Sequence, residues 1–191
     1  MTKRPPKHLL VTMAKASLVN GRELIKDAEV LLAAGRIPRA MALLILAVEE
    51  MSKGLLLWTW LSAERRGVEH SSKILWDGLR NHKAKLIMPG IVRELLQRPV
   101  DKSLTDEIAR LTEHLPEIMR SADTSNLIKQ CALYVLVEGT KVVSPSESIT
   151  EDHARTALRL TNSWSAFLEV IERYLTEGGR FQQSGVPSVD N

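Results

Sequence analysis

The stretch AMALLILAVEEMSK, residues 40–53, decides the fold of this 191-residue chain. Residues 40–48 are an unbroken apolar run, and a helix that is apolar nearly all round belongs in a protein interior. The run ends in Glu49, Glu50 and Lys53, and carboxylates carried into an interior cannot stay charged without partners. The stretch therefore predicts a central buried helix that carries either an internal salt-bridge cluster or the polar floor of a functional site.

The sequence around this stretch has the periodicity of two long helices. Apolar residues recur at steps of three and four over Lys7–Ala34, and again from Ile37 to about Arg66, which is the pattern of amphipathic helices. Gly35 lies between the two segments, and glycine commonly ends a helix. Because the connection is so short, the two helices are expected to be antiparallel neighbours.

The second half of the chain is less regular. A helix is expected over Leu127–Tyr134. The next segment, residues 134–143, alternates enough for a short hairpin, and it fits a frayed helix end running into a loop equally well. Residues 148–151 have the spacing of a capping box, with Thr150 as the alternative N-cap, and they start the last predicted helix.

The composition is that of an ordinary globular protein, with 44% hydrophobic and 26% charged residues. Only 4% of the residues are aromatic, which favours packed helices over a β-sandwich. We predict one all-α antiparallel bundle over residues 1–178 and a disordered tail over residues 179–191. No apolar run reaches the ~18 residues that span a bilayer, and the start lacks the pattern of a signal peptide, so we expect a cytoplasmic protein without a membrane partner.

The motifs of several enzyme classes are absent from the sequence. It contains no P-loop, no dinucleotide-binding glycine motif after a strand and no GxSxG nucleophile elbow. It also lacks HExxH, and its glutamate–histidine pairs have the wrong spacing for a di-iron bundle. The single cysteine, Cys131, excludes a disulfide framework and a cysteine-rich zinc site. We therefore expect neither a metal nor a cofactor.

Two further polar clusters are candidates to join the carboxylates at positions 49 and 50. The segment Arg80–Lys85 places His82 among basic residues, and a histidine is the usual general acid or base near neutral pH. Lys129 and Tyr134 are five residues apart and can flank one groove near a helix end. The basic segment alone is equally typical of a solvated helix face, and Tyr134 alone is more typical of core packing with its hydroxyl satisfied at a rim. The net charge of +3 permits nucleic-acid contact without requiring it.

The order of four segments resembles the AbiV-type abortive-infection family, a branch of the HEPN helical superfamily. The segments are GRIPRAMALLILAVEEMSKG (35–54), NHKAKL (81–86), IKQCALYV (128–135) and SPSESITEDHARTAL (144–158). The resemblance implies an HEPN-like helical bundle and a toxin-like bacterial anti-phage defence factor. The superfamily includes metal-independent endoribonucleases whose active form is usually a homodimer, so the resemblance also implies RNA as a substrate and a second copy as a partner.

The chain departs from the site pattern of the superfamily at one position. Such sites usually combine an Arg-x4–6-His motif on a late helix with a polar or acidic residue from an earlier helix. Here the candidate position reads Lys129-x4-Tyr134. Because a tyrosine with a pKa near ~10 is a poor base at neutral pH, His82 would have to be the acid–base group, with Glu50 orienting it.

This hypothesis gives each polar cluster a role. RNA cleavage through the ribose 2′-OH needs a base, an acid and positive charge on the phosphate. The residues expected in catalysis are His82, Glu50, Lys129 and Tyr134. The residues expected to bind RNA phosphates are Lys53, Arg80, Lys83 and Lys85, while Glu49 belongs to a structural polar cluster.

A non-catalytic function is the alternative. The charged cluster would then be a structural network, and defence would come from binding that blocks a phage protein or the host translation machinery. A third alternative is an antitoxin-like or scaffolding bundle whose partner is encoded nearby. Because the lysine and tyrosine replace the usual arginine and histidine, the sequence leaves open whether the chain is an enzyme.

Overall fold

The structure of the chain is a computed structural model. The residues that it describes are 5–65, 72–81, 85 and 122–176. Two candidate site residues, His82 and Lys83, lie outside these ranges, and so does the tail 179–191 for which disorder is predicted.

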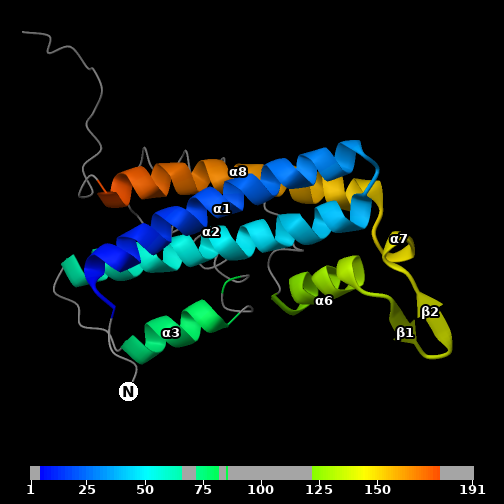
Figure 1. Cartoon of the computed structure of the whole chain (residues 1–191), viewed down its shortest axis with the longest axis horizontal. Coiled ribbons are helices and arrows are strands. Elements are labelled where there is room, and N and C mark those ends of the chain that lie inside the picture. The colour runs from blue at the N-terminus through cyan, green and yellow to red at the C-terminus, as the bar shows by residue number, and fades with distance from the viewer. Residues whose placement is uncertain (1–4, 66–71, 82–84, 86–121, 177–191) are drawn as a thin grey trace, which may run out of the picture.

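Three long helices, α1 (Lys7–Ala33), α2 (Ile37–Arg65) and α8 (Glu151–Thr176), run side by side (Figure 1). α1 and α2 are antiparallel, and α8 packs against both. The chain reverses after α1 because Gly35 adopts a φ of 71° and the Arg36 N–H caps a carbonyl of the last turn. The predicted bundle with long antiparallel central helices is therefore confirmed.

α1 and α2 approach each other closely at two glycines, Gly21 on α1 and Gly54 on α2. A Cβ on Gly21 would overlap the Met51 side chain, and a Cβ on Gly54 would lie 2.8 Å from the Leu18 side chain. Each glycine thus receives a large side chain from the opposite helix. Because protein interiors are close-packed, this reciprocal contact sets the depth at which the two helices pack.

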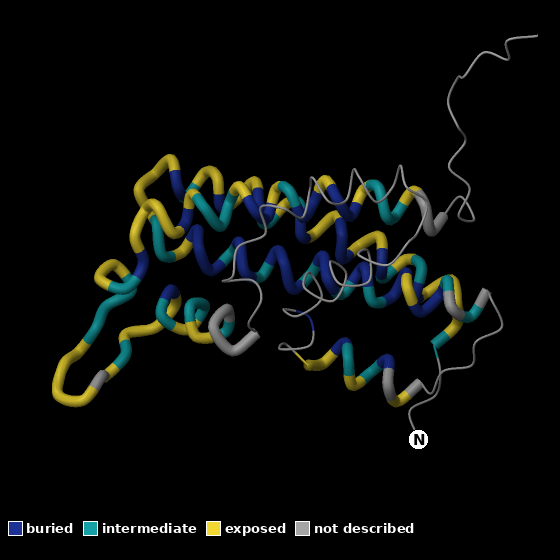
Figure 2. Tube along the Cα trace, turned by 180° about the vertical axis from the view of Figure 1, so that it is seen from behind, coloured by how far each residue is buried: buried dark blue, intermediate teal, exposed yellow. Residues whose placement is uncertain are grey.

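α2 is the central element of the core. Most residues of its apolar run 40–48 are buried, and Figure 2 shows this helix as largely buried along its length. On the α8 side, the rings of Trp164 and Phe167 stack with centroids 5.1 Å apart and close the core. The predicted central buried helix is confirmed. Even so, no helix within the described ranges is long and apolar enough to cross a membrane.

Two shorter helices, α3 (Ser72–Arg80) and α6 (Ala122–Leu133), pack on the side of α2 that faces away from α8 (Figure 1). α6 begins five residues before the predicted start at Leu127. This first turn was not predicted, because residues 122–126 are mostly polar and show no apolar periodicity. α6 also ends at Leu133, so Tyr134 lies just beyond the helix.

The segment that the sequence left open between a hairpin and a frayed helix end is a hairpin. Strands β1 (Leu136–Glu138) and β2 (Lys141–Val143) pair antiparallel, with Val137 opposite Val142. Gly139 allows the tight turn because it adopts a φ of 62°. The hairpin projects from the end of the bundle and is largely exposed in Figure 2.

The start of the last helix differs in part from the prediction. A one-turn helix, α7 (Pro145–Ser148), precedes α8, and its capping box joins Ser144 to Glu147. The predicted capping box at residues 148–151 is therefore wrong. The alternative N-cap is confirmed, since the backbone N–H of His153 donates to Thr150 Oγ1 at 3.3 Å.

Candidate functional site

A buried ion pair joins α2 to α6. Lys129 Nζ on α6 lies 2.5 Å from Glu49 Oε1 on α2, although the two residues are 80 positions apart in the sequence. Only 14% of the lysine side chain and 4% of the glutamate side chain are exposed. Glu49 lies just past the apolar run of α2, and its contact with Lys129 joins that helix to α6.

A second ion pair lies next to the first along α2. Lys53 Nζ contacts Glu50 Oε1 at 2.5 Å, and the two residues are three positions apart on the same helix. Neighbours at this spacing lie on one face of a helix. Their side chains are 20% and 23% exposed, so this pair is closer to solvent than the pair between Lys129 and Glu49.

Lys85 brings a third lysine into the same region. The residue is 5% exposed, and its amine interacts electrostatically with both carboxylates and both lysines of the two ion pairs. Among the residues that the structure describes, no carboxylate lies within ion-pair distance of this amine. Burial lowers the pKa of Lys85 below its ordinary 10.5, Glu49 partly opposes this shift, and Lys53 adds to it.

These five side chains, which we call the lysine–glutamate cluster, have an excess of basic groups. The cluster consists of Glu49, Glu50, Lys53, Lys85 and Lys129. Each carboxylate is already paired with one lysine, which leaves the amine of the third lysine without a counter-ion in the described part of the chain. A buried charge without a partner is unfavourable, so an anion that enters the cluster would be stabilised there.

The remaining candidate residues lie outside this cluster where the structure describes them. Arg80, at the end of α3, is exposed, and its guanidinium lies 6.0 Å from the centre of the Trp76 ring, within the range of a cation–π contact. Tyr134 is 61% exposed beyond the end of α6. The structure thus brings together Lys85, Lys129 and the three charged candidates of α2, but it leaves Arg80 and Tyr134 at the surface.

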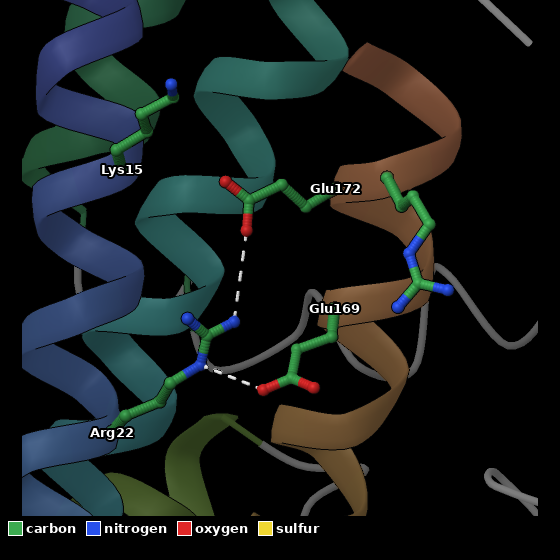
Figure 3. A pocket seen from close by; sticks show the side chains of 5 residues that line it. Lys15, Arg22, Glu169 and Glu172 are labelled. Carbon is green, nitrogen blue, oxygen red and sulfur yellow. Dashed lines mark ion pairs between the residues drawn. The ribbon is translucent and has the colours of Figure 1, made fainter. Parts of the chain in front are cut away.

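A second group of charged residues was not predicted from the sequence. An open groove of about 450 Å³ between α1 and α8 is lined by Lys15, Arg22, Glu169, Glu172 and Arg173 (Figure 3). Arg22 bridges the two glutamates at 3.3 and 3.8 Å. The two glutamates are three positions apart, so the sequence alone indicated that they share one face of a helix. It did not indicate that a residue of α1 would form ion pairs with them. These pairs are partly exposed and connect α8 to α1, and such pairs contribute little to stability.

Metal binding has no support in the described ranges, because no three histidine, cysteine, aspartate or glutamate side chains gather there in a way that could hold an ion. The lysine–glutamate cluster is the candidate site because the structure brings five of the charged residues predicted from the sequence together there. Its chemistry is that of amines and carboxylates, which can bind an anion and transfer protons.

A protein-family model described as AbiV matches residues 9–165, which include the whole lysine–glutamate cluster. The chain belongs to the AbiV family. AbiV is an abortive-infection family of the HEPN superfamily and acts in anti-phage defence. No curated protein and no solved structure matches the chain.

Proposed function

We propose that this AbiV protein is a metal-independent endoribonuclease that cuts RNA in the bacterial cytoplasm during phage infection. The observation that supports this proposal is the surplus amine of the lysine–glutamate cluster. Lys85 is buried near two carboxylates that are each paired with another lysine. A phosphodiester carries one negative charge, which matches the charge that the cluster lacks, and RNA presents such groups at every nucleotide.

The cluster supplies the binding and electrostatic parts of the reaction. In this proposal, Lys53, Lys85 and Lys129 hold the phosphate and stabilise the negative charge that develops on its oxygens during attack by the ribose 2′-OH. Glu50 orients the proton-transfer group, for which we retain His82, three residues before Lys85 in the sequence. In this proposal, Arg80 and Lys83 would contact neighbouring nucleotides of the RNA.

The test is incubation of purified protein with total RNA in the presence of EDTA. We expect cleavage products with wild-type protein and a loss of rate of about a hundredfold or more for His82→Ala, the scale of general acid–base catalysis. The matched control is His153→Ala, because His153 is an exposed histidine at the start of α8. Absence of cleavage by wild-type protein would refute the nuclease, whereas normal cleavage by His82→Ala would refute only the role of that histidine.

We also propose that the active form is a homodimer that pairs through the hairpin. Large apolar side chains are exposed at the end of α6 and on the hairpin, namely Leu133, Tyr134, Val135, Val137 and Val142. Exposed apolar patches of this kind mark interaction surfaces, and a two-stranded hairpin is marginally stable alone. A second copy would cover the patch.

Sedimentation equilibrium measures this assembly directly. We expect a dimer for wild-type protein and a monomer for Val137→Lys, because the lysine places a charge in the middle of the apolar contact. Val19→Lys is the matched control, since Val19 is also exposed but lies on α1. A monomeric wild-type protein at high concentration would rule out the dimer.

The same apolar patch supports the non-catalytic alternative, in which it binds a phage protein or a component of the host translation machinery. That alternative predicts wild-type protein without RNA cleavage. It also predicts that Val137→Lys abolishes phage resistance in cells while substitutions in the lysine–glutamate cluster that leave the protein folded do not.

A further inference from the structure

The two carboxylates of the lysine–glutamate cluster already occupy two of its three amines. The contact between Lys129 and Glu49 is the more buried of the two ion pairs. It spans two helices, whereas the contact between Lys53 and Glu50 lies within one helix. Lys85 faces the same groups without a carboxylate at ion-pair distance in the described residues. An anion that binds here therefore meets one available amine, that of Lys85, and two amines that Glu49 and Glu50 already hold.

We propose that Glu49 is a built-in competitor for the anionic ligand. Its carboxylate occupies the position beside the Lys129 amine that an RNA phosphate takes in the bound state. This inference rests on the proposed function for the class of ligand. A carboxylate and a phosphodiester are both oxyanions that accept hydrogen bonds from an ammonium group. The internal carboxylate thus makes the contact that the ligand would make.

Charge repulsion makes the competition unavoidable. A phosphate that reaches Lys85 comes close to Glu49, because the Lys85 amine interacts electrostatically with that carboxylate. Two negative charges repel each other more strongly where water is largely excluded than in bulk solvent. Binding therefore requires Glu49 to withdraw from Lys129, and the energy of that ion pair lowers the affinity of the site.

The decisive variant is Glu49→Gln, which removes the negative charge and keeps the size of the side chain and a hydrogen-bond acceptor. Lys129 and Lys85 then face the site without this opposing carboxylate. We expect the affinity for RNA to rise by about tenfold or more.

Fluorescence anisotropy with a labelled single-stranded 2′-O-methyl RNA of twelve nucleotides measures this binding. The probe lacks the free 2′-OH, so it reports binding without cleavage. Glu147→Gln is the matched control, because Glu147 is an exposed glutamate in the capping box of α7. Circular dichroism of each variant verifies that it is folded.

Tighter binding by Glu49→Gln, with the control at the wild-type affinity, supports the proposal. Equal or weaker binding by folded Glu49→Gln overturns it, and so does an absence of RNA binding in both wild-type protein and this variant. If Glu49→Gln does not fold, Glu49→Asp takes its place. The shorter side chain loosens the contact with Lys129, so the proposal predicts tighter binding, and unchanged or weaker binding overturns it.

The readouts for this inference and for the nuclease are separate. Cleavage of total RNA by wild-type protein tests the enzyme, whereas the affinity of Glu49→Gln for an uncleavable probe tests the competitor. A protein that binds the probe more tightly after the substitution, yet never cleaves RNA, would retain the competitor and lose the nuclease.

Discussion

Lys129→Met is expected to lower the free energy of unfolding by about 3 kcal/mol, the scale of breaking a buried ion pair by removing one partner. Methionine replaces the apolar stem of the lysine but leaves the Glu49 carboxylate, whose side chain is 4% exposed, without its lysine. Urea unfolding followed by circular dichroism measures the change. For a chain of this size, the melting temperature should fall by about 6 °C or more.

Lys26→Met is the control for this result. Lys26 forms an ion pair with Glu23 on the exposed face of α1, where both side chains are more than half exposed. Such exposed pairs contribute little to stability, because solvent screens their attraction. Equal effects of Lys129→Met and Lys26→Met would contradict the view that the pair on α2 and α6 is a buried contact.

A double substitution separates two effects of Lys129→Met: the lost attraction between the two side chains, and the cost of leaving the buried Glu49 carboxylate without its lysine. Glu49→Leu combined with Lys129→Met removes both charges, and we expect it to recover much of the lost stability, because apolar residues often replace a buried ion pair without loss. The coupling between the two positions is the difference between the double variant and the sum of the single variants. Additive effects would show that the two side chains do not depend on each other.

Lys85→Met is expected to act in the opposite direction and to stabilise the protein by about 1 kcal/mol or more at neutral pH. The side chain is buried and has no carboxylate at ion-pair distance within the described ranges. Its charge therefore opposes folding, as the lowered pKa of Lys85 also indicates. Removing the amine removes this unfavourable charge and keeps a flexible apolar side chain that fits irregular space.

The pH dependence of this effect follows from the direction of the pKa shift. Between the lowered pKa in the folded protein and the ordinary 10.5 in the unfolded chain, the unfolded chain binds more protons at Lys85. The stability of wild-type protein should therefore rise with pH across that window. Urea midpoints measured from pH 6 to pH 10 should show this rise in wild-type protein and a smaller rise in Lys85→Met. A destabilised variant, or an identical pH profile, would contradict the assignment of Lys85 as a charge without a counter-ion among the described residues.

Lys85 is therefore the group of this site that is expected to lower the stability of the fold. A lysine without a counter-ion is unfavourable in the empty protein and useful once an anion binds. Lys85→Met should therefore be more stable and bind RNA more weakly. Such trade-offs are common where a functional site retains groups that folding alone would not select.

The long helices could be predicted from the sequence because their pattern is local. The run at residues 40–48 is apolar on every face, and only a central position in the bundle can bury it. The capping box was predicted at the wrong residues because two neighbouring segments have the same local pattern. Ser144 and Glu147 have the same spacing as residues 148–151, and only the observed hydrogen bonds of Ser144 and Thr150 distinguish the two patterns.

Which side chains of the candidate site form ion pairs with one another could not be predicted from the sequence. It identified Glu49 and Lys129 as candidates but did not pair them, because their contact depends on where α6 packs against α2. We expected Tyr134 to flank the same groove as Lys129, which requires the helix to continue for five residues past Lys129. The helix ends at Leu133 instead, so the tyrosine is carried to the surface.

The glycines at the contact of α1 and α2 have a consequence for how the site can respond to a ligand. Sliding α2 along α1 would move Met51 away from Gly21 and press it against a residue that has a side chain. These contacts therefore hold α2 in position along α1, and α2 carries Glu49, Glu50 and Lys53. During ligand capture Glu49 can therefore withdraw only by rotation of its side chain, and any backbone adjustment at this contact falls to α6, which carries Lys129.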